Sequence, residues 1–147
     1  MREYYSLSEI ISFMENKNFD NFDIAKDHAS INSDNGIDIV IEAQGNKISD
    51  ENAELAIKVL KNLNECVNSA YKWLEHFNLK NGKRHSDALD GGFEISGIYF
   101  GKYGYGHWPM LTDGFTISFS TQNYHPCDFT VKFHKNMWPF AVEEWVS

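Results

Sequence analysis

Hydrophobic and polar residues alternate along several short stretches of the chain, which is the pattern of β-strands with one buried face. Residues 115–120 read FTISFS and residues 129–134 read FTVKFH, so apolar side chains fall on one parity and Thr, Ser, Lys and His on the other. Residues 93–100, FEISGIYF, are apolar on both parities toward their end, and residues 37–42, IDIVIE, are rich in β-branched side chains. These stretches predict a sheet of about four strands.

Two other stretches have helical spacing. Ser6 and Glu9 have the spacing of a capping box, which predicts a short N-terminal helix. Ser49 begins the strongest helical pattern, which keeps apolar residues at helical spacing to Leu74 and meets a stop signal at Asn81. A helix of about 28 residues is about 42 Å long. Because a helix of this length is longer than is needed to cover a small sheet, we expect the helix to bend, to break or to extend beyond the sheet.

The remaining segments complete an α+β prediction. Residues 16–35 are polar, with many Asn and Asp, and are expected to be irregular, while residues 80–92 predict a loop. Residues 137–145 predict a short terminal helix with Pro139 in its first turn. With no linker or repeat, residues 1–147 form one domain. We expect an antiparallel sheet of about four strands with one long helix packed on one face, plus the short N-terminal helix.

Charge and cysteine content narrow the possible partners. The formal net charge is −8, and residues 1–60 hold 12 acidic against 5 basic side chains. This disfavours nucleic acid and anionic membranes, which bind basic patches. The start of the chain lacks a secretory signal, and no apolar run approaches the about 20 residues that span a bilayer. Two distant cysteines, Cys66 and Cys127, form no disulfide framework, so we expect a cytoplasmic protein.

No strong catalytic or metal motif is present. His107, His125, His134 and Cys127 are close in sequence and have suitable ligand chemistry for zinc. Strand parity, however, places Cys127 with the core-facing Phe129 and His134 on the opposite face, which argues against both a metal site and a Cys–His nucleophile. We therefore expect no catalytic residue, no metal and no cofactor. Cys66 lies beside the apolar stripe of the long helix and is expected to be buried.

A glycine- and aromatic-rich stretch is the first candidate for binding. Tyr103, Tyr105, His107 and Trp108 lie among three glycines in residues 101–109, GKYGYGHWP. Tyrosine and tryptophan dominate the energetics of protein interfaces, so these side chains are candidate partner-binding anchors. A long hairpin connection whose aromatic side chains fold back onto the sheet explains the same composition.

Acidic residues of the first third are the second candidate. Asp20, Asp23 and Asp27, with Asp34 and Asp38, form the densest group. They are either an ordinary solvated surface or an electrostatic surface that orients a basic partner and speeds its association.

The order of these patterns over about residues 36–145 resembles small uncharacterised bacterial domains found among the immunity proteins of polymorphic toxin systems. The features that carry it are the β-branched strand, the helix opened by ISDENAE, the FEISGIYF strand and the closing TISFS and DFTVKF strands. Residues 1–35 lie outside the resemblance, and it assigns no functional residue. It implies a cytosolic α+β protein that neutralises a cognate toxin by binding, without catalysis.

The sequence thus favours a non-catalytic protein-binding module, with a basic toxin such as a nuclease as the partner. Two alternatives stay open. One is a small-ligand-binding protein or metal-dependent enzyme that uses the His107 loop or the polar sheet face of Thr116, Ser118, Thr130 and His134. The other is a structural subunit whose exposed aromatic side chains form a homo-oligomer.

Overall fold

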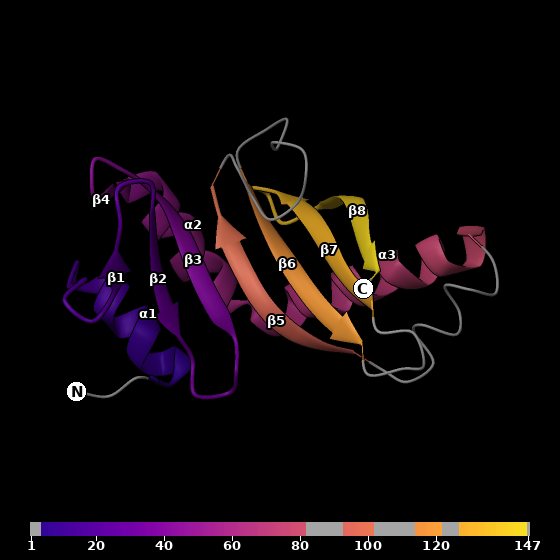
Figure 1. The fold of residues 1–147 in the computed structure, drawn as a ribbon, viewed down its shortest axis with the longest axis horizontal. Helices are drawn as coiled ribbons and strands as arrows, with labels where there is room; N and C mark the ends of the chain where they lie inside the picture. The colour runs from indigo at the N-terminus through magenta and orange to yellow at the C-terminus, as the bar shows by residue number, and fades with distance from the viewer. Residues whose placement is uncertain (1–3, 82–92, 102–113, 122–126, 147) are drawn as a thin grey trace.

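A large sheet covered by helices on one face forms the fold in the computed structural model (Figure 1). The structure describes residues 4–81, 93–101, 114–121 and 127–146. Its helices are α1 (Leu7–Glu15), α2 (Asp50–Lys61) and α3 (Leu63–Asn81). Its strands are β1 (Asp23–Ile24), β2 (His28–Asn32), β3 (Asp38–Gln44), β4 (Lys47–Ile48), β5 (Phe93–Phe100), β6 (Gly114–Thr121), β7 (Cys127–His134) and β8 (Pro139–Val146).

The eight strands make one mixed sheet in the order β1-β2-β3-β5-β6-β7-β8, with β4 paired to β3. Every pairing is antiparallel except that of β3 with β5, which is parallel. A parallel pair needs a long crossover connection, and α2 and α3 supply it behind the sheet (Figure 1). The fold is α+β as expected, but the predicted antiparallel sheet of about four strands with one long helix is wrong.

Two segments form strands where the sequence predicted none. The stretch 16–35, expected to be irregular, contains β1 and β2, which pair with one another and through β2 with β3. The stretch 137–145, expected to be a helix, belongs mostly to β8, which pairs along β7 and lies at the edge of the sheet. Pro139 begins β8, and an edge strand tolerates a proline at its first residue because that position needs no ladder donor.

The long helical pattern is two helices that meet at Asn62. The Asn62 backbone N–H donates to the Val59 carbonyl, and its side-chain amide donates to the Lys58 carbonyl at 2.8 Å, so Asn62 caps the end of α2. The helix then restarts at Leu63. Its length was expected to make the helix bend, break or overhang; it breaks at Asn62, and α3 also extends beyond the edge of the sheet at β8 (Figure 1). At the start of α1, the expected Ser6–Glu9 capping box is present in both directions.

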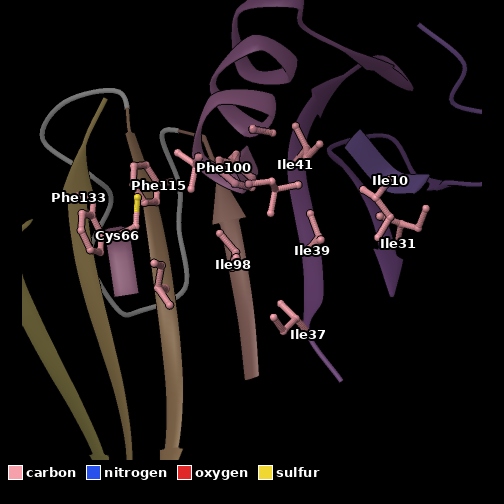
Figure 2. Packing of buried hydrophobic residues seen from close by; sticks show 14 of the residues in the cluster. Ile10, Ile31, Ile37, Ile39, Ile41, Cys66, Ile98, Phe100, Phe115 and Phe133 are labelled. Carbon is pink, nitrogen blue, oxygen red and sulfur yellow. The ribbon is translucent and has the colours of Figure 1, made fainter. Parts of the chain in front are cut away.

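The hydrophobic core lies between the helices and one face of the sheet. Aromatic side chains fill its centre: Phe115 of β6 stacks on Phe133 of β7 with ring centroids 4.6 Å apart, and Phe100 of β5 lies 5.8 Å from Phe115. Figure 2 shows Cys66 of α3 beside Phe115 and Phe133. Cys66 is 2% exposed, as expected, and burial together with the nearby Glu65 carboxylate raises the pKa of its thiol to about 11.

Candidate functional site on the polar face of the sheet

The face of the sheet opposite the helices collects most of the ionisable strand side chains. Strand alternation defines it, because in each strand the residues next to the core positions point the other way. Ile39 and Ile41 of β3, for example, belong to the core cluster, whereas Val40 between them is buried outside that cluster. We call this surface the polar face; it includes Asp23, His28, Ser30, Asp38, Val40, Glu42, Glu94, Tyr99, Thr116, Ser118, Ser120, Thr130, Lys132 and His134.

Carboxylates concentrate on the β1–β3 side of the polar face. Asp23 stands opposite Ser30 in the β1–β2 register and is exposed. Asp27, in the turn that follows β1, accepts a hydrogen bond at its backbone carbonyl from the Ala43 N–H at 2.9 Å, which places it next to the end of β3. His28 Nδ1 lies 2.7 Å from the Asp27 carboxylate, and this hydrogen bond lowers the pKa of Asp27. Asp27 therefore stays ionised near neutral pH.

Two of these carboxylates act electrostatically on Tyr99 of β5, in the middle of the sheet. Burial raises the pKa of its phenol to about 12, with further contributions from the Glu42 and Asp27 carboxylates. Both carboxylates therefore act on the same phenol, although Glu42 belongs to β3 and Asp27 to the turn between β1 and β2. The three side chains form one electrostatic group that spans β2 to β5.

Polar side chains at the centre of the same face are buried. In the strand register Tyr99 of β5 stands opposite Thr116 of β6, which in turn stands opposite Lys132 of β7. Thr116 has no exposed surface and Lys132 is 5% exposed. The Thr116 hydroxyl has no hydrogen-bond partner among the described residues. The neighbouring Thr130, 2% exposed, differs because its hydroxyl lies 3.1 Å from that of Ser118.

The acidic residues singled out in the sequence are only partly brought together. Asp23 and Asp27 flank β1, and Asp20 lies in the turn before it, where its N–H donates to the Asn18 side chain at 3.2 Å. All three are exposed. Asp34 lies in the β2–β3 turn, at the end of the hairpin away from Asp27. We use the name acidic edge for Asp20, Asp23, Asp27 and Glu42.

The candidate aromatic anchors Tyr103, Tyr105, His107 and Trp108 lie outside the described residues, so their role stays a prediction. His125 lies outside them as well, as does the side chain of Cys127. Within the part of the chain that the structure describes, no group of three or more His, Cys, Asp or Glu side chains could hold a metal ion.

Sequence reasoning missed Glu42, Tyr99 and Lys132 as members of one surface. Their parity was readable, since each alternates with core residues of its own strand, but their proximity depends on the order of the strands. It also missed Trp138 and Phe140 beside and within the edge strand β8, which are 73% and 38% exposed.

Two further findings bear on the class of protein. In the described segments no helix is both long and apolar enough to cross a membrane. Comparisons with protein-family models, with curated proteins and with solved structures found no match to this chain.

Proposed function

We propose that this chain is a protein-binding module that uses the acidic edge to engage a basic partner protein. The observation that carries the proposal is the common position of Asp23, Asp27 and Glu42 on the side of the sheet away from the helices. The core side chains of these strands face the helices, so Asp23 and Asp27 lie outside the core. Both are exposed, so their carboxylates can contact another molecule.

Electrostatics explain what such a surface does. Complementary charge between two proteins mainly raises their association rate and the specificity of the complex, and it has a smaller effect on the affinity. An exposed ion pair contributes about 0.2–1 kcal/mol, so three of them together change affinity by roughly 3- to 100-fold. The effect weakens as salt rises, because the screening length falls from about 10 Å at 0.1 M to about 3 Å at 1 M.

The finer form of the proposal is an immunity-type inhibitor that acts in the bacterial cytoplasm on a basic toxin such as a nuclease. Its support is the resemblance of residues 36–145 to immunity-associated domains, together with the net charge of −8. An acidic inhibitor imitates the charge of the nucleic acid that a nuclease binds. In this form of the proposal, Tyr103, Tyr105, His107 and Trp108 contribute aromatic contacts to the partner in addition to the contacts of the charged side chains.

The experiment begins with the partner. The tagged chain is used to capture proteins from its native host, and mass spectrometry identifies the specific ones. Calorimetry then measures the affinity of the purified partner at several salt concentrations for the wild type and for the Asp20→Asn, Asp23→Asn, Asp27→Asn triple variant. We expect the triple variant to bind roughly 3- to 100-fold more weakly and to lose part of the salt dependence.

A matched control removes the same number of charges elsewhere. Glu51, Glu54 and Glu65 are exposed on the helices α2 and α3, on the other side of the sheet. Their replacement by Gln is expected to leave the affinity within about twofold of the wild type, since distant surface substitutions have small effects. Equal losses in both triple variants would mean that net charge alone matters and would contradict a specific acidic edge.

A second candidate function is self-association through β8, favoured by the exposed Trp138 and Phe140 at an edge of the sheet. Edge strands readily pair with a further strand. Light scattering coupled to size-exclusion chromatography tests it: a dimer that the Trp138→Ser variant converts to a monomer would support self-association, and a wild-type monomer would exclude it.

A further inference from the structure

Thr116 is an unusual residue for its position. It lies at the centre of the sheet with no exposed surface, and its hydroxyl has no partner among the described residues. A buried hydroxyl left without a hydrogen bond destabilises the folded protein, because it has lost its contacts with water. Valine has nearly the same shape, suits a strand and avoids that cost. The hydroxyl is therefore better explained by a ligand than by packing.

Lys132 directly faces Thr116 across the β6–β7 pair. It is 5% exposed, and a buried ammonium is unfavourable unless it has compensating interactions. Lys132 already has an interaction within the protein. Because an ammonium carries three N–H donors, a ligand oxygen can be added to that interaction.

His134 adds a third donor on the same side. It follows Lys132 by two residues on β7, so both side chains leave the strand on the polar face. The backbone N–H of Asn136 donates to His134 Nδ1 at 3.2 Å. That bond requires an unprotonated Nδ1, so the ring proton lies on Nε2, which can act as a donor. Opposite His134 stands Gly114, which contributes no side chain to this face.

The carboxylates of the acidic edge belong to β1–β3 and the turns around them, whereas Lys132 lies on β7, three strands away from β3 in the sheet order. At about 4.8 Å per strand this separates the backbones of β3 and β7 by about 14 Å. Acidic residues also occupy positions of this face nearer to β7: Glu94 and Asp128 each stand opposite Ser120, and Glu143 stands opposite Thr130. Thr116, Lys132 and His134 bring three donors together on β6 and β7, and one of them is positively charged. Donors of this kind bind anionic oxygen.

We propose that Thr116, Lys132 and His134 form a binding site for the anionic oxygens of a small ligand, a phosphate or a carboxylate. The Thr116 hydroxyl, the Lys132 ammonium and His134 Nε2–H donate to these oxygens. This site is separate from the proposed protein-binding function, and its test needs no protein partner.

The test is a titration of the full-length ¹⁵N-labelled chain with sodium phosphate and, separately, with sodium acetate, at constant ionic strength kept by sodium chloride. Backbone amide shifts of residues 114–118 and 130–134 are followed by NMR. We expect saturable shifts in these residues with at least one anion, and the anion that binds more tightly identifies a phosphate or a carboxylate as the ligand group. Local saturable shifts distinguish binding from the general stabilisation that phosphate gives to most proteins.

Variants at Thr116, Lys132 and Thr130 test which side chains form the site. Thr116→Val and Lys132→Met are each expected to weaken binding roughly tenfold or more, because each removes a hydrogen bond to a charged group. Lys132→Gln serves as a second variant if Lys132→Met does not fold. Thr130→Val is the matched control: Thr130 is also buried, but its hydroxyl is paired with Ser118. It is expected to bind the anion within about twofold of the wild type, since it removes no donor of the site.

The same pair of threonine variants has opposite expected effects on the free protein. Thr116→Val removes an unpaired hydroxyl and is expected to keep or raise the free energy of unfolding, whereas Thr130→Val removes a paired hydroxyl and is expected to lower it. The proposal is overturned if neither anion gives saturable shifts in residues 114–118 and 130–134. It is also overturned if Thr116→Val binds as tightly as the wild type, even where Lys132→Met does not.

Discussion

Glu42 of β3 lies over Gly101, immediately after β5, so closely that the glycine has no room for a side chain. A Cβ at Gly101 would lie 2.5 Å from Glu42 Cβ and 2.8 Å from Glu42 Oε2. Gly101 also has a φ of +144°, a conformation that other residues rarely adopt. The glycine therefore allows the Glu42 side chain to rest on the backbone at the end of β5, beside Tyr99.

Gly101→Ala is expected to lower the free energy of unfolding by about 2–5 kcal/mol, since it adds backbone strain to a steric clash. Chemical denaturation measures the effect. Gly36→Ala is the control, because Gly36 has a φ of +86° but no atom within 4 Å of the added Cβ. It should cost only the backbone strain, about 1–2 kcal/mol. Equal losses in the two variants would contradict the close contact with Glu42.

Tyr99 is expected to ionise later than an ordinary tyrosine. Its pKa rises from 10.0 to about 12 on folding, so the protonated phenol is favoured in the native state. The stability that it contributes is complete below pH 10 and disappears as the pH rises through about 12. The phenolate absorbance is measured after a rapid pH jump in the wild type and in the Tyr99→Phe variant. The difference between the two curves should have its midpoint at about pH 12.

Glu42→Gln tests the cause of that shift. Removing one of the two carboxylates should lower the pKa of Tyr99 only in part, because burial is the largest cause and is retained. Glu54→Gln, on the exposed side of α2, should leave the pKa unchanged. A Tyr99 midpoint near 10 in the wild type would show that the phenol is neither buried nor close to the carboxylates.

Cys66 is expected to be unreactive while the protein is folded. With a pKa of about 11, only a small fraction of its thiol is ionised at pH 8.5. An ordinary thiol is half ionised at that pH, so Cys66 should be alkylated at least about 100-fold more slowly than a free cysteine. The rate is measured in a Cys127→Ser background, with denatured protein as the control. A fast reaction in the native state would contradict its place in the core.

The stacked pair Phe115–Phe133 is expected to be a main contributor to stability. Both side chains have no exposed surface and their rings stack at 4.6 Å. Phe115→Ala should therefore lower the free energy of unfolding by about 3–5 kcal/mol. Trp138→Ser, at a side chain 73% exposed, should change it by no more than about 0.5 kcal/mol. Thermal or chemical denaturation compares the two.

Local patterns predicted the elements that carry a clear signal. The strand 93–100, the two strands around 115–120 and 129–134, the capped start of α1 and the helix start after Ser49 all occur. The strand β2 was missed because only Ala29 and Ile31 of its five residues are apolar. Its stability comes from pairing with β3, which no local pattern records.

The prediction of a helix in the C-terminal segment was wrong for a different reason. A proline followed by apolar and acidic residues suits both the first turn of a helix and the start of an edge strand. The choice depends on the free edge of β7, which exists only after the sheet has formed. The parallel pairing of β3 with β5 is likewise a result of the helical crossover and cannot be read from either strand alone.

Several individual residues of the candidate site could be predicted from the sequence, but the surface that they form together could not. Asp23 and Asp27 were singled out from the sequence, whereas Glu42 was not, because its position near Asp27 depends on the hydrogen bond from the Ala43 N–H to the Asp27 carbonyl in the β1–β2 turn. Thr116 was predicted on the polar face, and its burial without a partner needs the structure.

The proposed role of the acidic edge is tested most directly by hydrogen–deuterium exchange of the chain with and without its captured basic partner. We expect the partner to slow exchange in peptides that cover residues 20–32 and 38–48, because these contain the acidic edge. Peptides from the exposed side of α2 should change little. Protection confined to the helices or to β8, with unchanged exchange in residues 20–48, would contradict the account.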